Sequence, residues 1–352
     1  MKRPPTLNDV ARVAKVSRSL VSLVFQDSPK VSDEKRAAVL KAAAKIGYQP
    51  NESARRLKSS VTKTIGVVLT DIHNPYYGEI FYGIENAGSE SEYKLLIGNA
   101  GFESDDLNQR ARIMGARQLD TVKTVRSQMV DGLVCSSLRT SPEDLFIAIG
   151  STPLVLIGHT TPALAKKYDV VITDEQDAAK QIVDHLADFG HKRITHISGG
   201  TDFGPAERTK RFLAEMKRQG LGNYAEVIEG SWSQEAGYNG AEEILNQKVL
   251  PTAIYAANDL IAMGVLAKLR ERKIRVPEDI SVVGFDNSTL AHLKIADITS
   301  VKEPLFQMGR TGFELLIERI DTRSKAFTPK FLKVKPQLVA RSSSGPRKKG
   351  SK

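Results

Sequence analysis

The sequence predicts a small all-α N-terminal domain followed by a larger α/β core made of two similar halves with parallel sheets. Within the first fifty residues, apolar side chains recur at helical spacing and each helical stretch follows a Ser or Thr. From residue 64 onward, short apolar runs alternate with amphipathic stretches, which is typical of buried parallel strands joined by crossover helices. A chain of 352 residues is long enough for two or three domains that each have a core.

The N-terminal pattern predicts three short helices. Thr6 caps the first helix, and Asp9 completes a capping box three residues later. Ser17 caps the second helix after a tight turn, and Ser32 caps a third that ends at Gly47. Two short helices joined by a tight turn form a helix-turn-helix, whose second helix enters the DNA major groove. The expected buried residues are Leu7, Val10, Ala11, Ala14, Leu20, Val21, Val24, Phe25, Ala38, Val39, Ala42, Ala43 and Ile46.

The exposed face of the second helix carries side chains that suit DNA. Arg18 can bind guanine through two hydrogen bonds, while Ser19 and Ser22 suit a base edge or a phosphate. Residues 1–63 contain 14 Lys/Arg against 5 Asp/Glu, a net charge of +9 out of +10 for the whole chain. A basic excess confined to one small segment indicates phosphate binding. A purely structural three-helix bundle is the alternative for this segment.

Residues 6–57 resemble the headpiece of the lactose-repressor family of bacterial transcription regulators, and the resemblance continues to about residue 341. The segments that carry it are TLNDVARVAKVS at 6–17, Val21-Ser22, VSDEKR at 31–36, GYQPN at 47–51 and ARRL at 54–57. The resemblance implies a homodimeric, sequence-specific DNA-binding regulator, most simply a repressor, that acts on a pseudo-palindromic operator. In this family a small-molecule effector controls DNA binding.

The resemblance also implies a hinge helix after Pro50 that folds only on DNA, where two such helices lie together in the minor groove. Leu57 is then the wedge inserted at the central base step, and Ala54 allows the two helices to approach closely. An apolar wedge costs unstacking energy, which a bent duplex offsets by contacting more protein. An ordinary linker leucine is the alternative for Leu57. The expected DNA-binding residues are Thr6, Arg18, Ser19, Ser22, Asn51, Ala54, Arg55, Leu57 and Lys58.

This sequence departs from the family pattern in the second helix. Leu23 stands where members usually carry Arg, and Leu20 where they often carry Thr. Phe25-Gln26-Asp27 replaces the usual Leu-Asn-Gly. Because a groove arginine is lost, the operator sequence of better-known relatives does not transfer to this chain.

Composition excludes several classes of protein. Cys135 is the only cysteine, so an intrachain disulfide and a cysteine-rich zinc site are excluded. No apolar stretch reaches transmembrane length and no secretory signal opens the chain, so we expect a cytoplasmic protein with no membrane partner. The six His residues lack the HExxH spacing, and GxSxG and GxGxxG are absent. We therefore expect no enzymatic activity, no cofactor and no metal.

The core is predicted to be a clamshell with a ligand between its halves. Apolar runs at 64–71, 93–100, 131–137 and 153–158 form the first set of strands, and the pattern restarts at 169–174. The resemblance agrees, because the family core looks like a periplasmic sugar-binding protein whose chain crosses three times between halves. The expected domains are a headpiece at 1–49, a hinge and linker at 50–63, and a core at 64–341, followed by a disordered basic tail at 342–352. Within the core, the first half is expected at 64–162 and 292–322, and the second at 163–291 and 323–341, with helix 304–321 on the first half and strand 330–340 on the second.

Polar and aromatic side chains at strand ends predict the ligand site. Asp71, Asn74, Tyr76 and Tyr77 follow the first strand, in a segment that resembles a family loop, and the glycine-rich residues 199–204 are a candidate ligand-facing loop. The resemblance adds Arg208, Trp232, Asn258 and Asp286 as effector contacts, and His159 follows another strand. Forked polar groups beside an aromatic face suit a polyol or sugar.

Alternatives remain for this site and for the whole chain. Asn258 and Asp286 are also plausible helix caps, and Trp232 a core residue. An anionic or nucleobase ligand is the alternative to a sugar. Arg211 replaces a usual Gly, and residues 101–130 are longer than the family pattern, which leaves open a DNA binder without a ligand. A sugar receptor without a DNA role is the remaining alternative.

Overall fold

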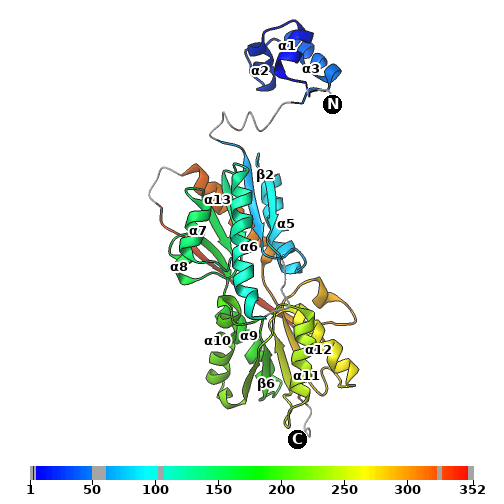
Figure 1. Ribbon diagram of the computed structural model, residues 1–352. Coiled ribbons are helices and arrows are strands. Elements are labelled where there is room, and N and C mark those ends of the chain that lie inside the picture. The colour runs from blue at the N-terminus through cyan, green and yellow to red at the C-terminus, as the bar shows by residue number, and fades with distance from the viewer. Residues whose placement is uncertain (1–2, 4, 50–60, 102–106, 323–326, 348–352) are drawn as a thin grey trace. The chain divides into compact units, whose positions relative to one another are not determined.

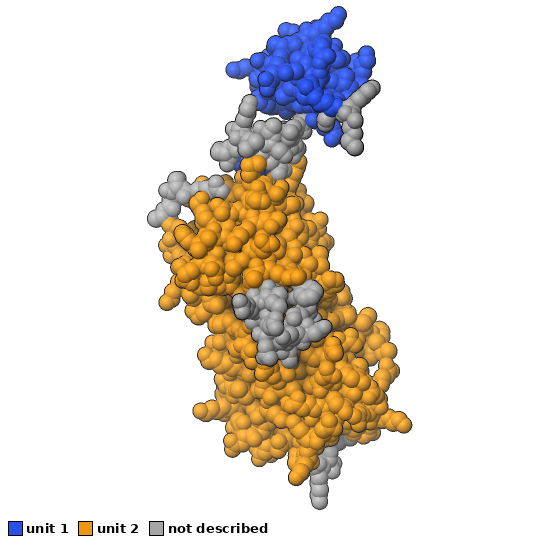
Figure 2. Space-filling model, in the orientation of Figure 1, with its two compact units in different colours: residues 1–62 blue, residues 63–352 orange. Residues whose placement is uncertain are grey.

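The computed structural model describes residues 3, 5–49, 61–101, 107–322 and 327–347, with the backbone alone for 107–114. The chain forms two compact units, Met1–Thr62 and Lys63–Lys352, which Figure 2 shows in different colours. The first unit is helical and the second is α/β with two sheets (Figure 1). The predicted fold class is therefore confirmed.

The first unit consists of three capped helices, α1 (Leu7–Ala14), α2 (Arg18–Phe25) and α3 (Asp33–Ile46). The Thr6 backbone N–H and hydroxyl donate to the Asp9 carboxylate at 2.9 and 2.6 Å, and Ser17 Oγ accepts from Leu20 N at 3.2 Å. Gly47 ends α3 with φ of +69°. The side chains that are buried here are Val10, Ala11, Val21, Val24, Val31, Val39, Ala42 and Ala43.

One predicted member of this small core is wrong. Ala38 is exposed, whereas Val39, Ala42 and Ala43 are buried. In an α-helix, successive residues are about 100° apart, so Ala38 lies off the stripe that begins at Val39. Leu23, which replaces a groove arginine, is half-buried and packs against this core.

The first half of the second unit is built on a six-stranded sheet in the order β11-β5-β4-β3-β1-β2, and all its neighbouring strands are parallel. Its strands are β1 (Thr64–Leu69), β2 (Lys94–Asn99), β3 (Gly132–Ser136), β4 (Leu154–Ile157), β5 (Asp169–Thr173) and β11 (Phe331–Val334). Helices cover both faces, so β1, β3 and β4 are buried throughout. The helices are α5 (Pro75–Ser89), α6 (Leu107–Ser127), α7 (Pro142–Ile149), α8 (Pro162–Ala165) and α13 (Leu305–Asp321).

The second half has a sheet in the order β12-β10-β9-β8-β6-β7, in which only β12 runs antiparallel to its neighbour. Its strands are β6 (Ile194–Ile197), β7 (Ala225–Ile228), β8 (Ala253–Ala256), β9 (Ser281–Asp286), β10 (Thr299–Lys302) and β12 (Gln337–Val339). Its helices are α9 (Glu175–Asp188), α10 (Phe203–Arg218), α11 (Gln234–Leu245) and α12 (Asp259–Glu271), with short 3₁₀ turns at Gly222–Tyr224 and Thr289–His292.

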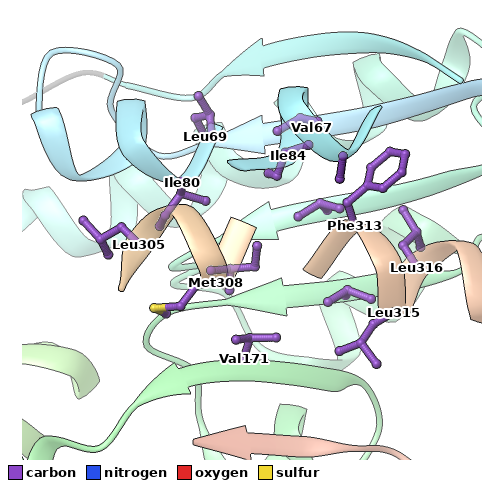
Figure 3. Packing of buried hydrophobic residues seen from close by; sticks show 14 of the residues in the cluster. Val67, Leu69, Ile80, Ile84, Val171, Leu305, Met308, Phe313, Leu315 and Leu316 are labelled. Atoms are coloured by element: carbon purple, nitrogen blue, oxygen red, sulfur yellow. The ribbon is translucent and has the colours of Figure 1, made fainter. Parts of the chain in front are cut away.

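Apolar clusters hold the helices to each sheet. On one face of the first sheet, Ile80 and Ile84 of α5 and Met308 and Phe313 of α13 pack against the strands, including Val67 of β1 (Figure 3). These side chains are nearly or fully excluded from solvent. The equivalent clusters of the second half lie under α11 and α12 on one face and under α9 and α10 on the other.

Each half contains one pair of helices in very close contact. A Cβ added to Gly83 of α5 would lie 1.9 Å from the carbonyl oxygen of Phe306 in α13. In the second half, a Cβ added to Gly264 of α12 would lie 1.9 Å from the carbonyl oxygen of Gln234 in α11. No residue with a side chain fits at either position without a backbone shift. Gly78 of α5 has open space around it instead.

The sheet topology corrects the expected division of the core. The sequence places residues 169–173 in the second half, whereas β5 pairs with β4 in the first sheet. It places residues 299–302 in the first half, whereas β10 pairs with β9 in the second sheet. The strand expected at 330–340 is two strands, β11 in the first sheet and β12 in the second. An apolar run predicts a strand but not its neighbour, which explains these errors. Helix α13 returns to the first half as expected.

The predicted disorder of the tail is wrong for residues 342–347. Ser343 and Ser344 are buried, and Ser343 Oγ donates to the Val282 carbonyl oxygen at 2.6 Å. The carbonyl oxygen of Gly345 accepts a hydrogen bond from His191 Nε2 at 3.0 Å. The tail thus satisfies buried polar groups of the second half, and polar composition alone does not reveal that. Residues 348–352 lie outside the described residues.

Candidate functional site

The exposed face of α2 presents the predicted DNA-reading side chains. Arg18 and Ser19 are exposed, and Ser22 is half-buried and accepts a hydrogen bond from Gln26 Nε2 at 3.4 Å. The Thr6 hydroxyl is occupied by the Asp9 carboxylate. Arg36 of α3 donates to the Ser28 carbonyl oxygen at 2.9 Å, which holds the loop after α2. Asn51, Ala54, Arg55, Leu57 and Lys58, the predicted hinge contacts, lie outside the described residues.

A cavity of about 390 Å³ lies between the two halves of the second unit. Its walls come from loops at the carboxyl ends of the strands, where ligands bind in open parallel sheets. All nine predicted effector residues line it, which are Asp71, Asn74, Tyr76, Tyr77, His159, Arg208, Trp232, Asn258 and Asp286. His73, which follows the same strand as Asp71, is not among the lining residues and its side chain is 89% exposed. The glycine-rich loop at 199–204 also lines the cavity.

The first half contributes a wall of aromatic and hydroxyl groups. Asn74 caps α5 by accepting from Tyr76 N at 3.0 Å, which directs Tyr76 and Tyr77 into the cavity wall. Their rings meet edge to face at 5.0 Å, and burial raises the pKa of both phenols, which remain protonated. Thr70 Oγ1 donates to the Ser136 carbonyl oxygen at 2.7 Å. This wall offers aromatic rings and hydroxyl groups, and its charged lining residues are Asp71 and Arg139.

The second half contributes a buried arginine whose charge is already balanced. Arg208 of α10 is 3% exposed and donates to both oxygens of Glu175, from Nε at 3.0 Å and Nη2 at 2.7 Å. Its Nη1 donates to the Ala257 carbonyl oxygen at 2.6 Å. The guanidinium also lies over the rings of Phe285 and Trp232, at 3.4 and 5.6 Å from the centroids. Burial is the largest single influence and would raise the pKa of Glu175, but the charge and hydrogen bonds of Arg208, with smaller effects of His159 and His196, lower it overall, so the pair is ionised.

Two strand-end residues that line the cavity, Asn258 and Asp286, have an unsatisfied polar atom or a strained backbone. Asn258 caps α12 through its Oδ1, which accepts from Ile261 N at 2.8 Å, while its Nδ2 is buried without a partner in the described structure. Asp286 ends β9 with φ of +92°, a conformation that is costly for a residue with a side chain. Burial raises the pKa of Asp286 well above its usual value, and the neighbouring Glu303 adds to this shift. Asn258 therefore does cap a helix, as the alternative predicted, but only its Oδ1 is used for this and its Nδ2 stays available.

A family model described as bacterial regulatory proteins, lacI family, matches residues 6–51, and a model of a periplasmic binding protein-like domain matches residues 183–344. The transcriptional repressor PurR of Photobacterium profundum is 32% identical over 96% of this chain and 98% of its own length. The chain belongs to the lacI family.

Solved structures of other proteins share the fold of this lacI-family chain. A lac repressor dimer bound to operator and the anti-inducer ONPF superposes with a TM-score of 0.81 at 24% identity, over 97% of this chain and all of that chain. A complex of the transcriptional regulator CelR with cellobiose has a TM-score of 0.68 at 28% identity, over 96% of this chain and 99% of that chain. The relatives are regulators rather than enzymes, in agreement with the sequence. Among the described residues, no helix is long and apolar enough to cross a membrane.

Sequence reasoning missed several charged residues at the lacI-family cavity. Arg139, in the loop after β3, pairs with Asp202, which precedes α10, at 2.7 Å, so this ion pair joins the two halves. Glu229 also lines the cavity. Glu175 and Glu303 do not line the cavity but interact with Arg208, which does. Each follows a strand, the same signal that identified Asp71, but lies where the chain crosses between halves. The crossing points depend on which sheet each strand joins.

His159 bridges the two halves as a neutral side chain. Its Nε2 lies 3.4 Å from Glu175 Oε1, and burial lowers the pKa of His159 to about 4. A Cβ added to Gly204 of α10 would lie 2.6 Å from the His159 ring, so helix and ring are in close contact. Its Nδ1 is buried without a partner in the described structure. His159 therefore supplies hydrogen-bonding capacity rather than charge.

The departures noted in the sequence leave the cavity intact. Arg211 donates to Glu207 at 2.7 Å and to Gln176 at 3.0 Å, and it is not among the lining residues. Within the long segment at 101–130, residues 107–127 form the 21-residue helix α6. Gln118 of α6 is buried and accepts from Arg139 N at 2.7 Å, so this helix supports the loop that carries Arg139. These departures do not fill the site.

Proposed function

We propose that this lacI-family chain is a homodimeric repressor that binds a pseudo-palindromic operator, and that a small hydroxyl-rich ligand in the cavity controls this binding. The observation that carries the proposal is the cavity itself, which brings all nine predicted residues together. Four of its lining residues also hold buried polar atoms without partners in the described structure, Thr140 Oγ1, His159 Nδ1, Thr160 Oγ1 and Asn258 Nδ2. A polyol can satisfy such donors and acceptors together. The CelR complex with cellobiose supports a sugar-like ligand.

On the DNA side, α2 enters the major groove and Arg18 reads a base there. The charge of residues 1–63, a net of +9, supplies the phosphate contacts. Leu57 acts as the minor-groove wedge, with Ala54 at the contact between two hinge helices. The operator-bound lac repressor dimer, to which this chain is similar, supports the proposal of a dimer.

Ligand binding and DNA binding are linked through the two halves of the core. The chain crosses between the sheets three times, after β5, after β10 and between β11 and β12. A ligand that contacts both walls favours one angle between the halves over another. It therefore shifts the equilibrium by its difference in affinity for the two arrangements, which is a coupling free energy between two sites.

DNA binding tests both parts of the proposal. The full chain binds a labelled operator selected from random duplexes, measured by fluorescence anisotropy, and one sugar of a panel changes that affinity about tenfold. Arg18→Ala weakens binding by about 1–3 kcal/mol and relaxes base preference at one position. Lys41→Ala, a loss of one exposed charge from α3, is the matched control. Equal losses with unchanged base preference would show that Arg18 does not read a base.

A further inference from the structure

The described cavity has no cationic side chain left over for a negatively charged ligand. Arg208 is paired with Glu175, and Arg139 is paired with Asp202. Burial lowers the pKa of His159 to about 4 and that of His196 to about 3, so neither imidazole is charged near pH 7. No cation among the described lining residues remains without an acidic partner.

Carboxyl groups remain after these pairs are formed. Asp286 lines the cavity, and in the described structure no hydrogen bond reaches its carboxylate. Glu303 is 5% exposed and its Oε2 is buried without a partner. The two residues end neighbouring parallel strands, since Asp286 is paired with Lys302 in the register of β9 and β10. Tyr76 and Arg208, which line the cavity, both interact electrostatically with Glu303.

The third buried acid of this region, Asp259, is satisfied by the protein. It accepts hydrogen bonds from Ser288 N at 2.7 Å, from Ser288 Oγ at 2.9 Å and from Ser300 Oγ at 2.6 Å. Asp259 therefore has a structural role in holding the end of β10 beside α12. Glu303 has a hydrogen bond from the Thr173 side chain alone, and Asp286 has no such set of donors.

We propose that the ligand of this cavity carries a positively charged nitrogen, which Asp286 neutralises with Glu303 close by at the end of the neighbouring strand, together with hydroxyl groups that satisfy Asn258 and Thr160. The inference rests on the proposed function, because it assigns the chemistry of the ligand that would control DNA binding. The Asn258 Nδ2 and Thr160 Oγ1 atoms are independent evidence for a ligand, because both residues are more than nine-tenths buried, line the cavity and have no partner for these atoms in the described structure. An amino sugar or an amino alcohol has this combination of groups.

Burying the carboxyl groups of Asp286 and Glu303 is unfavourable, and a ligand with a positive charge removes this penalty. Burial raises the pKa of Glu303 to about 7 and that of Asp286 well above its usual value. A buried carboxylate without a partner is unstable as an ion, whereas an ammonium group provides both the opposite charge and hydrogen-bond donors. An anionic ligand would face Asp286 and would compete with Glu175 for Arg208. Sugar acids and sugar phosphates are therefore disfavoured.

The test compares ligands that differ only in one nitrogen. Trp232 is the only tryptophan of the chain and lines the cavity, so its fluorescence reports binding. The probes are 2-amino-2-deoxy hexoses, their N-acetyl forms, the parent hexoses and the corresponding sugar acids. Tris(hydroxymethyl)aminomethane and the neutral tetrol pentaerythritol form a further pair without sugar stereochemistry. At least one amine is expected to bind about tenfold more tightly than its neutral partner.

Variants assign the preference to the two carboxyl groups. Asp286→Asn and Glu303→Gln should each bring the affinity ratio of amine to neutral partner close to one, whereas Glu79→Gln, on the exposed side of α5, should leave it unchanged. Two carboxyl variants are used because one of them can fail to fold. Thermal stabilisation by the same probes provides a second readout that does not depend on the tryptophan.

The outcomes separate this inference from the proposed function. A neutral or anionic probe that binds as tightly as its amine overturns the inference, and so does the absence of a saturable response to every amine. If a neutral sugar binds and changes operator affinity, the proposed function stands and the inference falls. If an amine binds with the expected dependence on Asp286 and Glu303 but leaves operator affinity unchanged, the inference stands and the control of DNA binding falls.

Discussion

The two halves of the second unit share a strand order but differ in what they bury. Among the described residues of the first half, the buried acids are Asp131 and Asp169, and both are satisfied. Asp169 accepts from Arg319 at 2.5 and 2.9 Å and from Lys330 N at 2.6 Å, while Asp131 accepts from Lys63 N at 2.8 Å. The buried charged residues of the second half and its crossings are Glu175, Arg208, Glu215, Asp259, Lys268, Asp286 and Glu303.

This difference indicates that the two halves share a fold but have different roles. A buried, satisfied carboxylate fastens one segment of a half to another, whereas a buried carboxylate with a raised pKa stores unfavourable energy. Such residues cluster at functional sites. The first half therefore provides aromatic rings together with Asp71 and Arg139, and the second half provides the buried charged residues of the site. What the halves share is their packing, including one glycine-mediated helix pair in each.

The largest expected effect tests the shared packing. Gly83→Ala and Gly264→Ala should each lower the free energy of unfolding by about 3 kcal/mol or more, because the new methyl group meets a carbonyl oxygen in each case. Gly78→Ala is the control within α5, and it should stabilise the helix by up to about 1 kcal/mol. Urea denaturation followed by circular dichroism measures all three. A loss in only one half would show that the two helix pairs are not equivalent.

The second prediction tests the satisfied acid of the first half. Asp169→Asn should lower the free energy of unfolding by about 3 kcal/mol, because Arg319 loses its ionic partner while it remains largely buried. Glu318→Gln, which removes an exposed acid from the same helix as Arg319, should change it by less than about 1 kcal/mol. Thermal and chemical denaturation of both variants measure the difference. An unchanged stability in Asp169→Asn would remove the contrast between the halves.

The third prediction concerns the second half, and here the substitution should raise the free energy of unfolding rather than lower it. Burial raises the pKa of Glu303 from 4.5 to about 7. The contribution of Glu303 to the free energy of unfolding is therefore fully present below pH 4.5 and is lost as the pH rises through 7. Glu303→Gln should therefore match the wild type near pH 5 and be more stable by about 2 kcal/mol near pH 8. Denaturation midpoints across this pH range measure the effect. A constant difference at all pH values would contradict a raised pKa.

The sequence predicted the elements of this molecule better than their partners. Capping residues and apolar spacing located α1, α2 and α3 because these signals are local. Apolar runs located most strands, but the assignment of β5 and β10 to sheets was wrong because it depends on pairing between residues far apart. The ordered tail at 342–347 was missed for the same reason, since its serines are satisfied by partners such as Val282 and Thr299.

The cavity was predicted in outline but not in its charge. The nine residues predicted from strand-end positions and the family resemblance all line the cavity, because the ends of parallel strands meet at one edge. Whether a lining charge is free or paired depends on contacts that spacing does not encode. Arg208 illustrates this, since its partner Glu175 lies 33 residues away in the chain. The excess of carboxyl groups becomes visible only after the ion pairs are assigned.

The three crossings also govern the order in which the protein can fold during synthesis. The helices of the first unit lie within the first 46 residues, so its core can form as soon as this segment leaves the ribosome. The first half of the second unit waits for α13 and β11, and the second half waits for β12 and the ordered tail. The unit that we propose binds DNA is therefore complete before the cavity that regulates it exists, and ligand control begins only when nearly the whole chain has been made.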